Sequence, residues 1–492
     1  MTGNAKIISA AVLVAVAVLA VAGTATIGGS EPDGRASARQ ADAVTSAGGP
    51  FRSRAGFNPP RAKVKVNRAK ASQLKVFVGS KVSGAAIYRA NGDLIWFRPC
   101  RCMDFRTQQF RGRPVLTWFE GPSKFTAVKR NTYMIANRNY RVIKRVQPGR
   151  GLSADSHEFN LTPRGTAFVT AYKSERRNLS FVGMGRNAPV SDSIAQEIDL
   201  RTGRVLWEWR SLDHVPVRHT YAEKLRRPGN PFDYFHINSI NDTRDGNIII
   251  SGRSTNAIYK VSRRTGRIIW TLGGKHSDFK MGKGAYFSSQ HDARELGGGR
   301  ISLFDNGDSP VLNRPVRKES RGLVLKLNHR KKRAVVDQQF FNPAKPLAPQ
   351  QANMQRLPNG NFFIGWGAVP LVSEHTPDGR LVFDAEFRGI SSFYRSYRDR
   401  WSGKPKGKVA VFARQARSGR TKLWISWNGD SAVREWRVAA GRSARSLKNQ
   451  GKWPRRGFES VINVPVSARF VKVAGLNGSG KRIGSSALIK VR

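Results

Sequence analysis

Short apolar runs separated by glycine turns fill the chain between about residue 73 and residue 402. One recurring phrase is a turn followed by a run that ends in an aromatic residue. Glycine in these turns supplies the positive φ of a tight hairpin, and the β-branched residues behind it predict strands. The phrase occurs at Asn91–Trp96, Thr202–Trp207, Thr265–Trp270 and Asp378–Phe383.

A second phrase, also a turn leading into a strand, occurs at Pro163–Phe168, Asp245–Ile250, Gly298–Leu303 and Pro358–Phe363. Both series fit a unit of about 55 to 60 residues, with some insertions and some copies that have lost the phrase. A repeat of this length that holds several short strands is typical of a propeller blade. Residues 73–402 are therefore predicted to form a β-propeller of six blades, with seven as the alternative.

Beyond Gly403 the phrases stop and a different set of short strands follows. About 90 residues of alternating strands at regular spacing predict an immunoglobulin or fibronectin-like β-sandwich over residues 403–492. This segment has no histidine and only three acidic residues, Asp430, Glu435 and Glu459, so we do not expect catalysis there. The predicted strands are Val409–Ala413, Lys422–Trp427, Val433–Val438, Phe458–Val464, Arg469–Ala474 and Ala487–Val491.

The N-terminus has the pattern of an export signal. Residues 7–30 contain no charged side chain and follow Lys6. Because roughly 20 apolar residues span a bilayer, residues 1–30 can act as a membrane anchor, or they can be a signal peptide removed after Ala22. Residues 31–72, rich in Ala, Ser, Gly, Arg and Pro, predict a flexible linker. We therefore expect an extracellular or cell-surface protein, in contact with the membrane if the segment stays uncleaved.

Composition narrows the class of protein. The 492 residues include 48 Gly and 11 Trp, which favours an all-β fold, and 86 Lys plus Arg against 33 Asp plus Glu give a net charge of +53. Such charge attracts polyanions, but it is spread along the chain without any nucleic-acid-binding motif, so we exclude nucleic acid as a partner. Two cysteines exclude a disulfide scaffold, and the one-residue spacing of Cys100 and Cys102 makes a mutual disulfide strained.

Three histidines share one position relative to the second phrase. His157, His236 and His291 stand eight to ten residues before the turn glycine, and Gln351 takes that place in a fourth copy. In a propeller, equivalent positions are related by rotation about the axis, so these side chains are predicted to face one funnel. The alternative is that each is a polar strand-end residue bonded to nearby backbone, but three in register favour a shared site.

The surroundings of these histidines suggest which chemistry the funnel supports. Strand alternation turns His236 and Asn238 to one face, and Arg253 lies at the far end of the next strand. A neutral imidazole can be a nucleophile, a base or a metal ligand. A fixed cation such as Arg253 opposes a metal ion in the same pocket, so we expect neither a metal nor a cofactor.

These residues resemble the bacterial arylsulfotransferases and their actinobacterial relatives, over roughly residues 80–390. The order His, His, Arg, His is the specific part of the resemblance. It implies a six-bladed propeller that moves a sulfuryl group from a phenolic sulfate ester to another phenol, without a nucleotide donor, through a transiently sulfated histidine. The matching segments are Ser156–Phe159, Phe235–Ile240, Asp245–Arg253, Thr265–Gly274, Gln290–Ala293 and Leu357–Asn361.

Carried over by motif, the resemblance implies that His291 is the nucleophile. It implies that His157, His236 and Arg253 bind the sulfate and stabilise its developing charge. We assign substrate binding to Asn238, Gln351 and Asn353. The expected partners are a small-molecule aryl sulfate donor and a phenolic acceptor.

The chain departs from the better-known members of that family in two respects. Cys100 and Cys102 do not correspond to the cysteine pair near their site, and a short tether replaces their N-terminal β-domain while a C-terminal sandwich is added. The alternative function is a non-catalytic extracellular propeller that binds an anionic ligand or a cell-wall polymer. A binding module needs positive charge in the funnel but has no need of a nucleophile.

Overall fold

The structure is a computed structural model, and all of its described residues belong to one compact unit, which begins at Gly48. The predicted export segment and residues 31–49 and 69–72 of the predicted linker lie outside the described residues. In the part of the chain that is described, no helix is long and apolar enough to span a membrane. The described residues are 50–68, 73–122, 131–222, 230–309, 314–416 and 419–492.

Antiparallel sheets of four or five strands make up the region from Arg61 to Asp399. In each sheet the strands follow one another from the innermost to the outermost. The first three sheets are β28 (Ser396–Asp399), β2 (Lys75–Ser80), β3 (Gly84–Tyr88) and β4 (Leu94–Arg98); β5 (Cys102–Phe110), β6 (Arg113–Glu120), β7 (Thr132–Ala136) and β8 (Val142–Val146); and β9 (Phe159–Leu161), β10 (Thr166–Arg177), β11 (Ala188–Asp199) and β12 (Val205–Arg210).

The next three sheets are ordered in the same way, except that the outermost strand β17 is parallel to its neighbour β23. They are β13 (Ile237–Asp242), β14 (Ile248–Gly252), β15 (Ala257–Val261) and β16 (Ile268–Gly273); β18 (His291–Gly297), β19 (Arg300–Asp305), β22 (Arg321–Asn328), β23 (Arg333–Phe340) and β17 (Lys280–Met281); and β24 (Asn353–Arg356), β25 (Phe362–Gly365), β26 (Leu371–His375), β27 (Leu381–Arg388) and β1 (Arg61–Asn67). A small ribbon pairs β20 (Asp308–Ser309) with β21 (Arg314–Pro315), and the helical segments are α2 (Ser211–His214), η1 (Ser180–Val182) and η2 (Val217–His219).

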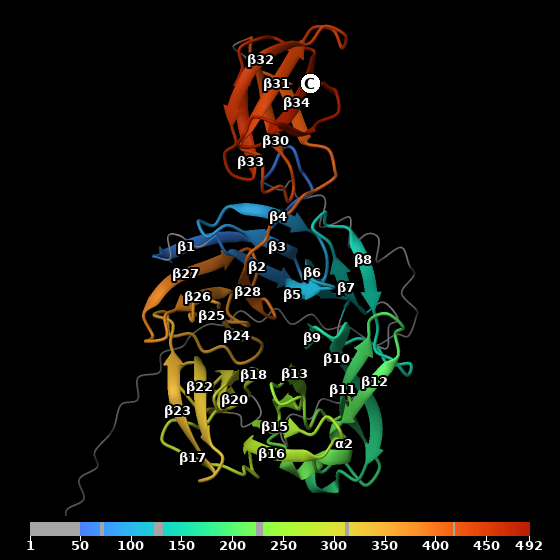
Figure 1. Ribbon diagram of the computed structural model, residues 1–492, viewed down its shortest axis with the longest axis vertical. Coiled ribbons are helices and arrows are strands. Elements are labelled where there is room, and N and C mark those ends of the chain that lie inside the picture. Colours follow the sequence, from blue (N-terminus) through green and yellow to red (C-terminus); the bar gives the residue numbers. More distant parts are fainter. Residues whose placement is uncertain (1–49, 69–72, 123–130, 223–229, 310–313, 417–418) are drawn as a thin grey trace, which may run out of the picture. The chain divides into compact units, whose positions relative to one another are not determined.

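These six sheets follow one another around a common centre (Figure 1). Each sheet contacts the next in turn, and β24 contacts β28, so that the series of contacts returns to its start. The closure is made by pairing between the two ends of the region, because β28 adds to the edge of β2 with Phe77 opposite Tyr397. The innermost strands therefore enclose the axis on which the candidate site lies.

Burial on both faces explains why many strands are continuously apolar. In β14 the side chains of Ile249 and Ile250 point to opposite faces of the sheet, as successive strand residues must, yet both are fully buried. Ile250 belongs to a core cluster with Phe168 and Trp209 of the preceding sheet, whereas Ile249 packs in a cluster with Leu303 of the following one. The core thus lies between the sheets rather than along a single face.

One strand lies where the sequence predicted a flexible linker, and that part of the prediction is wrong. β1 pairs antiparallel with β27, with Ala62 opposite Phe387. Its sequence alternates basic residues with small apolar ones, and Ala62 and Val64 pack against the cluster that contains Phe387 and Phe393. The short alternation Lys63-Val64-Lys65-Val66 has too little apolar surface to be recognised without its partner strand.

The C-terminal residues form two further sheets around one core. Strands β29 (Ala410–Gln415), β30 (Thr421–Ser426) and β33 (Glu459–Val464) make the first sheet, and β31, β34 and their neighbours make the second. Buried residues from both sheets, among them Ile425 and Trp436, belong to a single cluster. The second sheet includes two strands outside the sequence prediction, and its members are β32 (Lys448–Pro454), β31 (Glu435–Gly441), β34 (Phe470–Leu476), β35 (Arg482–Ser485) and β36 (Ile489–Lys490).

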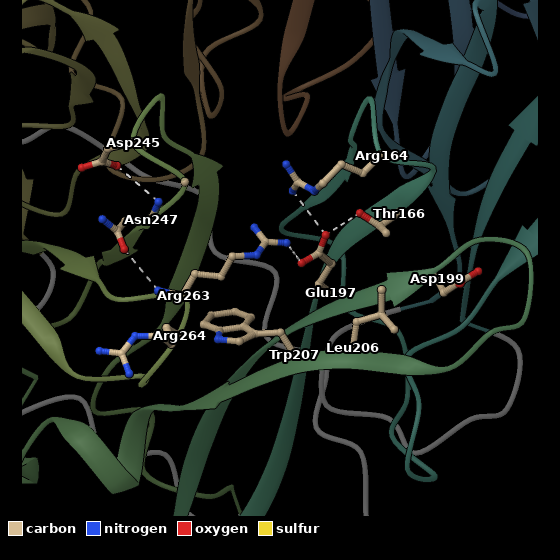
Figure 2. A pocket seen from close by; sticks show the side chains of 11 residues that line it. Arg164, Thr166, Glu197, Asp199, Leu206, Trp207, Asp245, Asn247, Arg263 and Arg264 are labelled. Carbon is tan, nitrogen blue, oxygen red and sulfur yellow. Dashed lines mark hydrogen bonds and ion pairs between the residues drawn. The ribbon is translucent and has the colours of Figure 1, made fainter.

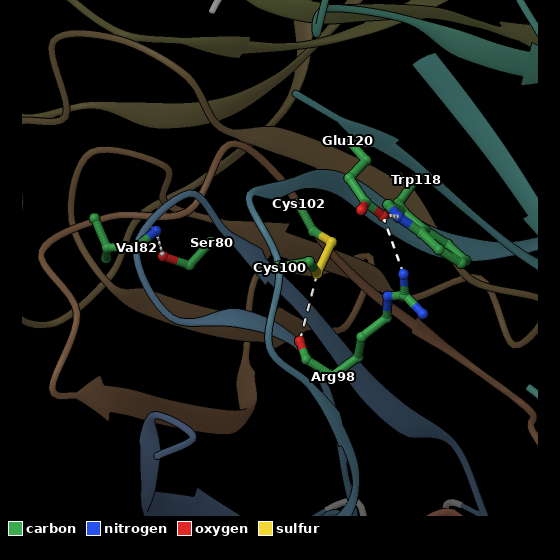
Figure 3. The surroundings of a disulfide bond; sticks show 7 residues. All are labelled: Ser80, Val82, Arg98, Cys100, Cys102, Trp118 and Glu120. Carbon is green, nitrogen blue, oxygen red and sulfur yellow. Dashed lines mark hydrogen bonds and ion pairs between the residues drawn. A yellow bond between two sulfur atoms is a disulfide. The ribbon is translucent and has the colours of Figure 1, made fainter. Parts of the chain in front are cut away.

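The two cysteines are joined to each other (Figure 3). Their Cα atoms are 5.3 Å apart, within the usual range for a disulfide, so the backbone before β5 accommodates a bridge that the one-residue spacing made unexpected. Cys102 is buried at the start of β5, and Cys100 is half-buried with its Sγ 3.4 Å from the Arg98 carbonyl oxygen. The spacing of the two cysteines in the sequence does not show the bend that the backbone makes between Arg98 and Cys102.

Candidate functional site

The structure places the three histidines at the same end of three consecutive innermost strands. His157 lies two residues before β9, His236 directly precedes β13, and His291 is the first residue of β18. The ring centroids of His157 and His236 are 5.0 Å apart in an edge-to-face arrangement. Gln351, two residues before β24, also reaches this cluster, because its backbone N–H donates to Nε2 of His291 at 3.2 Å.

Arg253 joins this group from the end of β14. Its backbone N–H donates to the carbonyl of His236 at 3.0 Å, and its Nη2 donates to the carbonyl of Pro349 at 3.2 Å. The side chain is only 7% exposed, so its charge acts in a medium of low polarity. The preceding Gly252 permits this approach, since a Cβ there would lie 2.6 Å from Thr255 Oγ1 and 3.0 Å from the Phe235 ring. We call His157, His236, Arg253 and His291 the histidine cluster.

Two of the histidines are each bonded to a carboxylate. Nδ1 of His157 lies 2.6 Å from Oδ2 of Asp155, and Nδ1 of His236 lies 2.6 Å from Oδ2 of Asp233. A carboxylate in this position holds the proton on Nδ1, turns Nε2 away from itself and stabilises the imidazolium form. Sequence reasoning missed both acids, although each stands only two or three residues before its histidine.

His291 has neutral partners instead. Its Nδ1 lies 2.9 Å from the carbonyl of Ser289 and 2.8 Å from Oδ1 of Asn306, and its Nε2 accepts from the Gln351 backbone N–H. Burial lowers the pKa of His291 well below its usual value, and the charge of Arg253 lowers that pKa further. The imidazole is therefore neutral at pH 7, with the lone pair on Nε2.

The two asparagines assigned to substrate binding connect neighbouring sheets. The amide of Asn353 donates to the carbonyl of Ser396 at 2.8 Å and accepts from its N–H at 3.0 Å. Asn238 donates through Nδ2 to the Gln290 carbonyl at 2.7 Å, one residue from His291. Both side chains are fully buried, so in this structure they act on the strands that carry the cluster.

A set of buried ion pairs lies next to the cluster, and sequence reasoning missed it. Its members stand on, or directly before, the innermost strands β5, β9, β18 and β28. Glu158 is fully buried between Arg106, at 2.8 Å, and Arg294, at 2.6 Å. Burial by itself would raise the pKa of Glu158, but the guanidinium groups around it hold that pKa at about 2. We call this set the axial ion cluster, and its members are Asp104, Arg106, Glu158, Asp292, Arg294 and Arg395.

The axial ion cluster had no specific signal in the sequence. The triplet Asp-x-Arg occurs at Asp104–Arg106 and at Asp292–Arg294, near the start of β5 and of β18, but it also occurs at four places outside the cluster. Both aspartates have positive φ, 51° and 58°. Beyond the cluster, a cavity of about 300 Å³ is lined by Arg106, Thr107, Asn160, Asn241, Asp292, Arg294, Leu296, Ser302, Met354, Gln355, Arg356 and Tyr397.

Another pocket, of about 680 Å³, is lined by residues of the sheets β9–β12 and β13–β16 and by none of the histidine cluster (Figure 2). At its centre the buried Glu197 accepts from Thr166 and forms ion pairs with Arg164 and Arg263. Its lining includes the turns that precede β10 and β14, whereas His157 and His236 precede β9 and β13. The pocket is therefore at a different place from the histidine cluster. Within the described residues, no group of three His, Cys, Asp or Glu side chains is arranged to hold a metal ion.

Comparison with solved structures finds distant likenesses, and a search of curated protein sequences finds no match to the chain. A Bacteroides caccae protein of unknown function is 14% identical, with a TM-score of 0.41, over 67% of this chain and 100% of that one. Virginiamycin B lyase from Staphylococcus aureus is 9% identical, with a TM-score of 0.35, over 75% of this chain and 97% of that one. TM-scores this low say nothing of what this chain binds or transforms.

A family model covers the site itself. The model described as "Arylsulfotransferase (ASST)" matches residues 106–388, more than half of the chain. That stretch carries all four members of the histidine cluster together with the acids and amides that contact them. The chain belongs to the arylsulfotransferase family.

Proposed function

We propose that the protein is an exported six-bladed β-propeller enzyme that transfers a sulfuryl group from a phenolic sulfate ester to a phenolic acceptor through a sulfated His291. The observation that supports this most directly is the difference among the three histidines. Two have carboxylate partners that favour the cation, and His291 has amide oxygens that leave it neutral. One neutral nucleophile beside cationic groups is what sulfuryl transfer requires.

In the first half of the reaction, Nε2 of His291 gives up its hydrogen bond from the Gln351 backbone N–H and attacks the sulfur of the aryl sulfate. The N–S bond forms as the S–O bond to the aryl group breaks, and the phenolate leaves. A protonated His157 or His236 gives its Nε2 proton to that phenolate, and the carboxylate on its Nδ1 keeps the ring oriented during the transfer. The released phenol and a sulfated His291 are the products of this step.

In the second half, the acceptor phenol takes the place of the first. The histidine that lost its proton takes the proton of the acceptor hydroxyl, and the phenolate oxygen attacks sulfur as the N–S bond breaks. His291 returns to its neutral form and the acidic histidine to its cationic form, so the cycle is balanced in atoms and charge. No nucleotide, metal or redox partner enters either step.

Arg253 has the place and the charge to bind the sulfuryl oxygens. A guanidinium can make two parallel hydrogen bonds to a sulfate group, and the bond strengthens as the oxygens gain charge in the transition state. The net charge of +53 on the whole chain would also increase the rate at which anionic aryl sulfates arrive. The alternative, a module that only binds anions, has no use for a neutral Nε2 among these cations.

The test is to trap the intermediate. The purified full chain is incubated with p-nitrophenyl sulfate, with and without phenol as acceptor, and the peptide that contains His291 is examined by mass spectrometry. We expect a sulfuryl adduct on that peptide and release of nitrophenol that depends on phenol. The variant His291→Asn should lose both.

The matched control is His276→Asn, which removes an exposed histidine outside the cluster and should leave adduct and turnover unchanged. An adduct that survives His291→Asn would move the nucleophile to another residue. No adduct and no turnover with several aryl sulfates would favour the binding module.

A further inference from the structure

Asn306 touches the proposed nucleophile on the side away from its reactive nitrogen. It directly follows β19 and is fully buried, and its Oδ1 lies 2.8 Å from Nδ1 of His291. His157 and His236 have an aspartate in the corresponding place, at 2.6 Å. Asparagine is nearly the same shape as aspartate but carries no charge. The difference therefore lies in electrostatics rather than in packing.

The orientation of the Asn306 amide is fixed by its other contacts. Its Nδ2 donates to the carbonyl of Ala348 at 2.7 Å and to the carbonyl of Gln351 at 3.2 Å. Two carbonyls can accept only from the NH₂ end, so the oxygen end has to face His291. An oxygen at 2.8 Å from Nδ1 then requires that Nδ1 carries the proton.

Two further partners of His291 require the same tautomer. The Ser289 carbonyl also accepts at Nδ1, and the Gln351 backbone N–H donates at Nε2. Gln351 contributes to both sides, because its carbonyl holds the Asn306 amide while its N–H faces Nε2. Its φ of 67° turns the peptide into this position.

We propose that Asn306 is a positioning residue that keeps the proton on Nδ1 of His291 without making the ring basic, so that Nε2 is a neutral nucleophile. This rests on the proposed function of His291. The proposal also explains why an asparagine, and not an aspartate, faces Nδ1 of His291. An aspartate would hold the same tautomer but would stabilise the imidazolium, both before attack and in the sulfated intermediate, where Nδ1 keeps its proton.

The charges around His291 oppose its protonation in the native protein. Arg253, His236 and His157 all disfavour a positive charge on it. On its own strand, Asp292 is bonded to Arg294. On the side of Asn306, Asp305 is bonded to Arg321 at 2.9 Å. These two carboxylates are thus neutralised by arginines, and Asn306 adds no further negative charge.

The test is the variant Asn306→Asp, with the pH dependence of kcat/KM for p-nitrophenyl sulfate as the readout. In the native protein the neutral form is the reactive one and burial lowers the pKa of His291, so activity should persist well below pH 6.5. The new carboxylate should raise the pH at which activity is half lost by ~1–2 units. Asn359→Asp, on an exposed turn, adds the same charge and should not shift the profile.

A second measurement does not depend on turnover. Histidine labelled with ¹⁵N in the full chain reports which ring nitrogen carries the proton, and His291→Asn identifies the signal. We expect Nε2 of His291 to be unprotonated at pH 7 in the native protein and the ring to take up a second proton at higher pH in Asn306→Asp. A proton on Nε2 in the native protein would overturn the proposal.

The two failures can be told apart. Suppose that the native protein forms the adduct but that Asn306→Asp does not change the pH at which activity is half lost. The inference about Asn306 is then wrong and the proposed function stands. If the native protein transfers no sulfate, the proposed function fails, and the ¹⁵N titration still decides what Asn306 does to His291. If Asn306→Asp loses activity at every pH but keeps the same pH dependence, Asn306 has a purely structural role, and the inference is again overturned.

Discussion

The histidine cluster and the axial ion cluster are neighbours, since Glu158 directly follows His157 and Asp292 directly follows His291, but they use charge in opposite ways. In the axial ion cluster every arginine has a carboxylate within 3.5 Å, and Glu158 alone contacts Arg106, Arg294 and Arg395. In the histidine cluster, Arg253 donates to a backbone carbonyl and His291 contacts amide oxygens. The first arrangement satisfies charge internally, and the second places a neutral imidazole beside cationic groups.

This contrast indicates which residues near the axis are candidates for chemistry. Buried arginines are often interpreted as anion sites, but a guanidinium already bonded to two carboxylates has little to offer an incoming sulfate. Arg395, for example, is fully buried and reaches Asp104, Glu158 and the Asn238 carbonyl. We therefore expect that removing charge from the axial ion cluster changes stability, and that removing it from the histidine cluster changes activity.

The largest expected effect comes from breaking the axial ion cluster. Glu158→Gln leaves three buried guanidinium groups with less negative charge, so the free energy of unfolding should fall by ~3–5 kcal/mol. Urea unfolding followed by tryptophan fluorescence measures it. Glu386→Gln, at a partly exposed pair with Lys65, should change it far less. Equal losses of unfolding free energy in the two variants would contradict a structural role for the axial ion cluster.

Arg253→Ala should give the opposite result to Glu158→Gln. Loss of a positive group aimed at the sulfuryl oxygens should lower kcat/KM for p-nitrophenyl sulfate by ~10²–10³-fold. The urea midpoint should move less than in Glu158→Gln, which removes the negative charge shared by three buried guanidinium groups. Arg264→Ala, which removes an exposed arginine outside the cluster, is the matched control and should leave both quantities unchanged. A large loss of stability with intact turnover would place Arg253 among the structural arginines.

Catalysis by the two carboxylate-bonded histidines should depend on the charge of their aspartate partners. Asp155→Asn removes the charge at His157 and should lower kcat by ~10–10²-fold, because the imidazolium that donates the proton is less stabilised. Donors with better leaving phenolates need less proton transfer and should be less affected. A comparison of p-nitrophenyl sulfate with phenyl sulfate measures this difference. An identical loss with both donors would argue against a role in proton transfer.

The smallest expected effect concerns the disulfide. Cys100 and Cys102 close a loop of only three residues, so their bond removes little entropy from the unfolded chain. Cys100→Ser with Cys102→Ala should lower the free energy of unfolding by about 1–2 kcal/mol. Thermal unfolding with and without a reductant checks this on the native chain. A loss as large as that of Glu158→Gln would mean that the bridge holds the start of β5 in place.

The repeats were predictable because their signals are local. A turn glycine with positive φ, such as Gly246 at 78° or Gly360 at 87°, and a β-branched run behind it specify a hairpin without help from distant residues. The same periodicity placed His157, His236 and His291 in one register, since equivalent residues of repeated units occupy equivalent places. The family resemblance depended on those same segments.

Other features depended on contacts that spacing does not encode. The pairing of β1 with β27 and of β28 with β2 joins residues more than 300 positions apart, and no local pattern names the partner. Asp155 and Asp233 stand near their histidines in sequence, but only the fold turns their carboxylates onto Nδ1. The Asn238 and Asn353 amides, assigned to a ligand from their position, are held by neighbouring backbone.

Turn chemistry and strand periodicity are properties of adjacent residues, so the amino-acid sequence was enough to predict repeated β units with three histidines in matching places. That His291 is neutral could be known only from the folded chain. The answer depends on whether an amide or a carboxylate lies against Nδ1 of the ring, and on how much water burial removes from it. For His291 the deciding amide, Asn306, comes from beyond the next strand, and the fold alone brings it there.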